Sequence, residues 1–234
     1  MKLPFDEYTL KARTLPAFLV ISPILIFGPI VCSKLFGLFK TCIGSSILAL
    51  ALLVLMNAVI RQLGVNQGKK LFEKWGGPPS TRFMRWRDTQ WTKEYKAKLH
   101  SIVKNKLNIS LSSEAEELRD PVNADKKIED AFLMLRNKLR GKKEFLTHQD
   151  NIDYGFSRNL YGGKWLWIFL SFLSVILLSI FPIISKYKIS ILELSFSIIY
   201  LIVVILVEFL IMPKNVEHCS VRYAESSWSK IIDL

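Results

Sequence analysis

Four long stretches of this chain carry almost no charge, and each is long enough to cross a lipid bilayer. Residues 14–33, 41–60 and 165–185 are uncharged, and the fourth stretch, 189–213, contains two glutamates. A spanning helix needs about 20 predominantly apolar residues. The sequence therefore predicts an all-α membrane protein with four transmembrane helices and one all-helical domain, residues 61–164, inserted between the second and third spans.

The distribution of apolar residues divides the chain into two hairpins, one domain and one tail. The expected parts are an N-terminal hairpin (1–60, spans at about 15–33 and 41–60), a basic helical domain (61–164), a C-terminal hairpin (165–212, spans at about 165–185 and 189–212) and a tail (213–234). Pro23 and Pro29 should kink the first span. Cys32 and Cys42 flank the first turn, as a disulfide or as two small apolar residues.

Most of the positive charge lies between the second and third spans. The chain has a formal net charge of +12, and residues 61–164 hold 22 Lys and Arg against 13 Asp and Glu. Because cytoplasmic segments near span ends are rich in Lys and Arg, this domain and both termini should be cytoplasmic in a multi-pass membrane protein. A basic domain favours anionic partners, namely lipid headgroups, nucleic acid or nucleotides.

The basic domain shows helical periodicity and no alternating strand pattern. The second span should continue as a helix to Lys74 and end at the turn Gly76–Pro79. Ser80 or Thr81 should cap a new helix that continues through Arg87. Further helices are expected at 88–106, after the capping signal Ser113–Glu116, at 128–139 and at 145–160.

The segment after the glycine-proline turn is the best candidate for a ligand site. Glycines and a capping hydroxyl leave backbone N–H groups available to phosphate, while arginines and a tryptophan add charge and a stacking surface. The candidate ligand-binding residues are Ser80, Thr81, Arg82, Arg85, Trp86, Arg87 and Arg158. The alternative is a tight turn whose arginine and tryptophan side chains anchor to anionic headgroups.

Polar residues in the fourth apolar stretch are candidates for a pore lining. Glu193, Ser197 and Glu208 fall on one side of a helix. Acidic side chains on one face of a membrane helix turn inward, and a ring of them from several subunits selects cations. In the alternative interpretation, each glutamate lies about one turn from a helix end and reaches the membrane interface.

No enzyme motif is present, so we expect no catalytic residues, metal or cofactor. The sequence lacks a Walker loop, a paired cysteine motif and a nucleophile elbow. His148, Asp150 and Asp153 do not share one helical face, which favours a solvated helix start over a metal site. Two alternatives to a channel remain: a membrane scaffold or sensor that binds anionic lipid or an acidic protein, and a lipid-modifying enzyme with an atypical site.

Three blocks of sequence carry a resemblance to a known family. Gly76–Asp88, Asp153–Leu160 and Arg222–Glu225 resemble segments of small bacterial membrane effectors of anti-phage defence, in particular the membrane effector of the Hailong system. The resemblance implies a homo-oligomeric ion channel. It further implies that a short DNA oligomer, made by a nucleotidyltransferase encoded nearby, holds the channel closed until infection.

Overall fold

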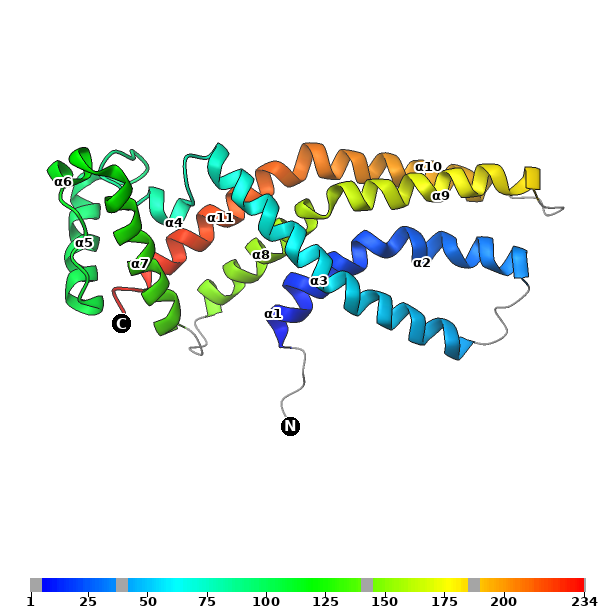
Figure 1. Cartoon of the computed structure of the whole chain (residues 1–234), viewed down its shortest axis with the longest axis horizontal. Coiled ribbons are helices and arrows are strands. Elements are labelled where there is room, and N and C mark those ends of the chain that lie inside the picture. Colours follow the sequence, from blue (N-terminus) through cyan, green and yellow to red (C-terminus); the bar gives the residue numbers. More distant parts are fainter. Residues whose placement is uncertain (1–5, 37–41, 140–144, 185–189, 234) are drawn as a thin grey trace. The chain divides into compact units, whose positions relative to one another are not determined.

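The described parts of the chain are helical throughout. The computed structural model describes residues 6–36, 42–139, 145–184 and 190–233, and no strand occurs in these ranges (Figure 1). The predicted all-α class is therefore confirmed. The side chains of Cys32 and Cys42 lie outside the described residues, so their pairing stays a prediction.

The helices belong to two compact units. Unit 1 comprises the described residues of 1–69 and 155–216, and unit 2 those of 70–154 and 217–234. The elements are α1 (Glu7–Thr9), the π-helix η1 (Leu10–Thr14), α2 (Leu15–Phe36), α3 (Cys42–Lys74), α4 (Pro79–Arg82), α5 (Lys93–Leu107), α6 (Glu114–Arg119), α7 (Pro121–Leu139), α8 (Phe145–Gly162), α9 (Lys164–Ile184), α10 (Ile191–Leu206), the π-helix η2 (Val207–Ile211) and α11 (Met212–Ser229).

Two helical stretches are long and apolar enough to cross a membrane, Glu7–Ile30 and Ile191–Ser229. A third candidate is the pair Leu146–Gly162 and Lys164–Ile180, which is bent by 53°. The expected span at 41–60 lies in α3, whose side chains are described only from residue 51. Membrane-spanning helices are thus supported, whereas the number four remains a prediction.

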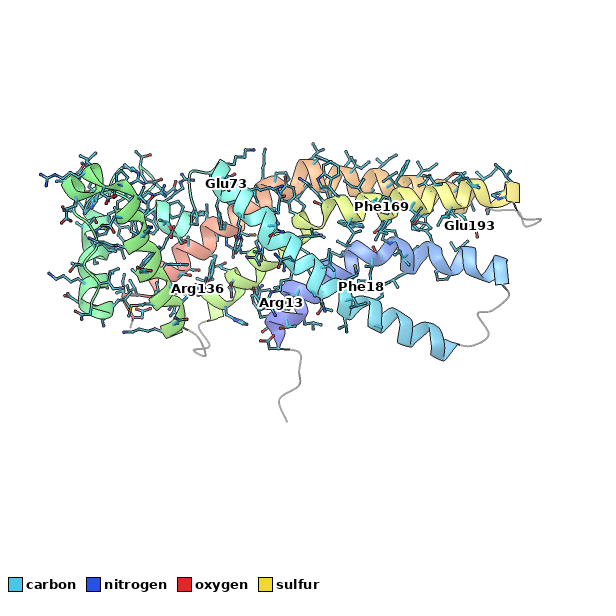
Figure 2. The ribbon with its side chains drawn as sticks, in the orientation of Figure 1. Arg13, Phe18, Glu73, Arg136, Phe169 and Glu193 are labelled. Atoms are coloured by element: carbon cyan, nitrogen blue, oxygen red, sulfur yellow. The ribbon has the colours of Figure 1, made fainter. Side chains whose placement is uncertain are left out.

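Many large apolar side chains are exposed on the surface of unit 1. Helix α9 packs against α2 and α10, as Figure 1 shows. Phe18 on α2 and Phe169 on α9, both labelled in Figure 2, are 46% and 57% exposed, while Ser197 and Glu208 are fully buried. Large apolar side chains face outward where a soluble protein would place polar ones, which is the distribution that a lipid environment favours.

Helices α3 and α8 cross at a pair of glycines in unit 1. A Cβ atom on Gly162 would lie 2.5 Å from the Cα of Gly64, and one on Gly64 would lie 2.8 Å from the Cα of Asn159. Only glycines permit this close approach of the two backbones. Beside the crossing, the Asn159 side-chain amide donates a 2.7 Å hydrogen bond to the carbonyl of Ala12, within η1.

The core of unit 2 draws on helices from both ends of its sequence. Its buried apolar residues are Met84, Leu99, Val103, Leu107, Ile128, Ala131, Phe132, Leu135, Trp228 and Ile231. Trp228 packs on Phe132 with ring centroids 5.4 Å apart. The expected tail at 213–234 supplies two of these core residues, Trp228 and Ile231, both of which are completely buried.

Local signals at helix ends have mixed outcomes. The capping box of Ser113 and Glu116 is present, as predicted. The helix expected over 88–106 begins instead at Lys93, where the Thr92 side chain accepts a hydrogen bond from the N–H of Tyr95. The helix expected from Ser80 or Thr81 through Arg87 is wrong. It is replaced by the four-residue α4, whose N-cap, Pro78, has no side chain that can cap.

Candidate functional site

The candidate ligand segment begins at a glycine turn that only glycine tolerates well. Gly76 and Gly77 have φ angles of +74° and +122°, in the region that other residues rarely adopt. A Cβ atom on Gly77 would lie 2.6 Å from a guanidinium nitrogen of Arg85. Arg85 also donates a 2.6 Å hydrogen bond from Nη1 to the carbonyl of Gly76. The turn therefore serves to seat this arginine.

Two arginines of the segment share one carboxylate on α7. Arg85 donates from Nε and Nη2 to the two oxygens of Asp125 at 2.8 and 2.9 Å. Arg87 donates from Nη2 to the same oxygens, at 2.8 Å each, and from Nη1 to Glu117 at 3.0 Å. Planar, multidentate pairs of this kind are the stronger charged hydrogen bonds in proteins. They fasten the segment to α6 and α7.

Two buried side chains of opposite charge, Glu117 and Lys96, hydrogen bond to the backbone of the same segment. The Glu117 carboxylate is almost fully buried and also accepts from the backbone N–H groups of Trp86 and Arg87 at 2.9 and 3.1 Å. The Lys96 ammonium, only 1% exposed, donates to the carbonyls of Arg85, at 2.7 Å, and Asp88. The irregular backbone between α4 and α5 is thus held by buried charged side chains in addition to a few backbone hydrogen bonds of single turns.

An imidazole lies beneath the tryptophan of this segment. The rings of Trp86 and His100 have centroids 4.7 Å apart, and His100 Nε2 lies 2.9 Å from the carbonyl oxygen of Met84. Burial lowers the pKa of His100 from its ordinary 6.5, against the opposing effect of the Met84 carbonyl. The neutral ring therefore donates to that carbonyl and packs on the indole.

The predicted ligand-binding residues differ in how much of each side chain is available. Trp86 Nε1 donates to the carbonyl of Ser112 at 2.8 Å, and Thr81 is 1% exposed. Arg82 makes a looser pair, with its Nε 3.4 Å from Asp88, and its side chain is 30% exposed. Ser80 accepts a 2.7 Å hydrogen bond at its carbonyl from Trp228 Nε1.

Arg158, the seventh predicted ligand residue, belongs to unit 1, where its Nη2 lies 3.4 Å from Asn159 Oδ1. The other six belong to unit 2. The ion pairs that occupy Arg85 and Arg87 are not visible from the sequence, because Asp125 lies about 40 positions away. Ligand binding by these residues remains a prediction, and Arg82, with its single 3.4 Å ion pair, is the least engaged of the three clustered arginines.

Buried hydroxyl groups in unit 1 are satisfied by protein partners. Ser22, on α2, and Trp167, on α9, both hydrogen bond to the Tyr200 hydroxyl of α10, at 2.5 and 3.0 Å. Ser171 and Ser197 donate to carbonyls of their own helices. The three helices are therefore tied together at Tyr200, a residue that sequence reasoning did not single out.

The three predicted pore-lining residues have different surroundings. Glu193, shown near the start of α10 in Figure 2, accepts a 2.9 Å hydrogen bond from the N–H of Ser190 in a capping box. Ser197 is buried and bonded to the carbonyl of Leu194. Glu208 lies in η2, is 0% exposed, and neither carboxyl oxygen has a hydrogen-bond partner. Glu208 therefore differs in kind from the other two.

A lysine near Glu208 is held by aromatic rings. The Lys164 ammonium lies 4.0 Å from the ring centroid of Tyr161, and 5.7 and 5.8 Å from those of Trp165 and Phe209. A cation over aromatic faces is attracted by their quadrupoles. Lys164 was not singled out from the sequence, although its aromatic neighbours in the chain, Tyr161 and Trp165, were a signal.

The acidic residues near His148 have an electrostatic partner in unit 2. Arg222 on α11 pairs with Asp150, which is 3% exposed, and lies 3.9 Å from Asp153. In the described ranges, no group of three or more His, Cys, Asp or Glu side chains is arranged to hold a metal ion. This arrangement joins α8 to α11.

The comparisons with known proteins give no assignment. No family model, curated protein or solved structure matches this chain.

Proposed function

We propose that this protein is a homo-oligomeric ion channel of the bacterial inner membrane that acts as an effector in anti-phage defence. In this proposal it has four spans, and a nucleotide or short DNA oligomer, made by a nucleotidyltransferase encoded nearby, gates it through the basic helical unit 2. The observation that carries the channel proposal is Glu208, a buried carboxyl without a hydrogen-bond partner in the most apolar part of the chain. Acidic groups at such positions mark ion pathways.

Unit 2 is formed by two separate segments of the chain, which supports an even number of membrane crossings between them. Its two segments, 70–154 and 217–234, form one compact body and must lie on the same side of a bilayer. The chain between them therefore crosses an even number of times, as α9 and α10 would if each spanned the membrane once. The abundance of Lys and Arg around unit 2 favours the cytoplasmic side.

Cysteine labelling tests this topology. Cysteines placed at Lys126 and Lys230 should both be protected from a membrane-impermeant reagent in intact cells, whereas one at Lys188, in a segment outside the described residues, should react. Because Lys126 and Lys230 share unit 2, they must behave alike. Reaction of the cysteine at position 126 would show that unit 2 lies outside the cell. Different reactivity at positions 126 and 230 would contradict the proposed topology.

Conductance of the purified protein tests the channel. In planar bilayers we expect cation-selective current, and Glu208→Gln should reduce the selectivity because the open pore loses a negative charge. Glu193→Gln is the matched control on the same helix and should have the smaller effect, since its carboxylate caps the helix. Absence of current with and without oligonucleotide would refute the channel.

Binding of a short oligonucleotide tests the gating ligand. Arg82→Glu should weaken binding, and the affinity of the unmodified protein should fall steeply as salt rises. Arg85 and Arg87 are poor probes. Replacing either one removes donors from the Asp125 carboxylate, so a loss of binding could come from partial unfolding of unit 2. If Arg82→Glu changes liposome association and leaves oligonucleotide binding unchanged, the segment binds lipid instead.

A scaffold or sensor is the second candidate, and one observation favours it. The N–H donors of Arg85, Arg87 and Lys96 form hydrogen bonds within unit 2 itself, as expected of a segment that binds no ligand. A scaffold would associate with anionic lipid or an acidic protein and carry no current, so the bilayer measurement separates the two.

A further inference from the structure

Glu208 is exceptional among the buried polar groups of unit 1. The buried serines of α2, α9 and α10 donate to carbonyls of their own helices. Glu208, by contrast, is fully buried with both carboxyl oxygens unpartnered. A polar group in this situation costs free energy, and an ionised one costs several kcal/mol more.

The positive charge of Lys164 does not neutralise this carboxyl by contact. Lys164, at the start of α9, is the charged side chain that acts on Glu208 through space. Its ammonium is seated over the Tyr161 ring, and no hydrogen bond joins it to either Glu208 oxygen. An ionised Glu208 would therefore be both desolvated and without a donor.

A metal ion is a poor occupant for this position. Hard cations take about six oxygen ligands, several of them carboxylates or carbonyls. Within the described residues, no group of three or more His, Cys, Asp or Glu side chains could hold an ion. A proton needs only one oxygen.

We propose that Glu208 is a proton-binding site: in the conformation described, its carboxylate has taken up one proton from the aqueous phase and is a neutral carboxylic acid. The reaction forms one O–H bond and removes one negative charge from the helix interior. The neutral acid is compatible with the buried, unpartnered position. Proton binding then stabilises the conformation in which Glu208 is buried.

The π-helical segment gives this site a route to water. In η2 the N–H of Met212 bonds to the carbonyl of Val207, which places one extra residue in the turn that contains Glu208. Single π-turns occur frequently at functional sites. A shift of one residue would rotate the side chain by about 100°. If the protein is the channel proposed above, on which this step rests, the rotation would expose Glu208 to water and ionise it as the pore opens.

Reaction with dicyclohexylcarbodiimide, which modifies protonated carboxyls in apolar surroundings, tests the site. The full-length protein in liposomes is treated over a range of pH and the modified residue is identified by mass spectrometry. We expect modification at Glu208 that falls about tenfold per pH unit above its titration midpoint. Sodium at constant pH should have no effect. Glu193, hydrogen-bonded in a capping box, is the matched control and should react far less.

Several results would overturn the proposal. These are no modification at any pH, modification that does not vary with pH, or protection by sodium, which would indicate a cation instead of a proton. Glu208→Gln retains the shape of the neutral acid, so it should fold and abolish the modification at this position.

An infrared measurement provides a readout that is independent of the reagent. The carbonyl band of a neutral carboxyl should be present in the unmodified protein and absent in Glu208→Gln, and its presence in both would count against the site. Neither measurement uses current. A protein that is modified at Glu208 but carries no current would therefore refute the channel and retain the proton site.

Discussion

The buried carboxylate of Glu117 is the side chain on which the irregular segment of unit 2 most depends. It accepts hydrogen bonds from two backbone N–H groups and from the Arg87 guanidinium. Glu117→Gln replaces one acceptor oxygen with a donor group and removes one of the two carboxylates that pair with Arg87. We expect a loss of about 2–4 kcal/mol in the free energy of unfolding, measured by denaturant titration in detergent.

The matched control is Glu114→Gln, three residues earlier. Glu114 pairs with Lys93, and the two side chains are 52% and 64% exposed. Exposed pairs contribute little, so the expected change is within about 0.5 kcal/mol. Equal losses in the two variants would show that the Glu117 network is not structural.

His100 should make the stability of unit 2 sensitive to acid. Burial lowers its pKa below the ordinary 6.5, so the unfolded chain binds a proton more readily than the folded one. The stability that the neutral ring contributes is present above about pH 6.5 and is lost as the pH falls toward the folded-state pKa. In denaturant titrations, His100→Gln should lose less stability than the unmodified protein on acidification. An unchanged slope would contradict this assignment.

At the scale of single elements, the contact between α3 and α8 depends on the absence of side chains. A Cβ atom on Gly162 meets the backbone of Gly64 at 2.5 Å, so Gly162→Ala forces the helices apart. Overpacking of this kind costs about 1–3 kcal/mol, which should appear as a lower melting temperature in detergent.

Gly28→Ala is the matched control for the crossing. A Cβ atom there would lie 3.8 Å from the Ile24 side chain, an ordinary contact. Since alanine is the better helix former, by about 1 kcal/mol, the melting temperature should stay constant or rise. If the two variants melt alike, the glycine crossing is not a tight one.

Helix positions were predictable where the signal is local. The continuation of α3 to Lys74 and the capping box at Ser113 follow from residues within a few positions of each other. The segment from Thr81 to Arg87 was not predictable, because its backbone is held by Glu117 and Asp125 from other helices. No sequence period records which distant carboxylate an arginine will meet.

At the scale of the molecule, the sequence indicated where apolar helices lie but not how the units are assembled. The helical periodicity of 88–106 predicted most of α5, the helix that carries the core residues Leu99 and Val103. The inclusion of Trp228 and Ile231 in the same core was missed, because one tryptophan and one isoleucine in a short polar segment give no periodic signal. Glu208 was singled out from the sequence as a pore-lining candidate, which stays a prediction, whereas its complete burial is visible only in the packed helices.

The contribution of the last residues to unit 2 can be measured with neighbouring isoleucines. Ile231 is completely buried, and Ile232 is 44% exposed. Ile231→Ala should destabilise unit 2 by about 2–5 kcal/mol, and Ile232→Ala should change stability by less than about 1 kcal/mol. Tryptophan fluorescence during denaturant unfolding follows the change, since Trp228 lies in the same core. Similar losses would indicate that these residues do not pack as described.

The split composition of unit 2 has a consequence for biosynthesis. Ribosomes deliver residues 70–154 first, then the apolar helices α9 and α10, and only afterwards Trp228 and Ile231, which complete the core. Until the last helix emerges, the nascent domain exposes the apolar surface that those side chains will cover and is open to chaperones and proteases. Folding of the domain is therefore completed only after α9, α10 and α11 have left the ribosome.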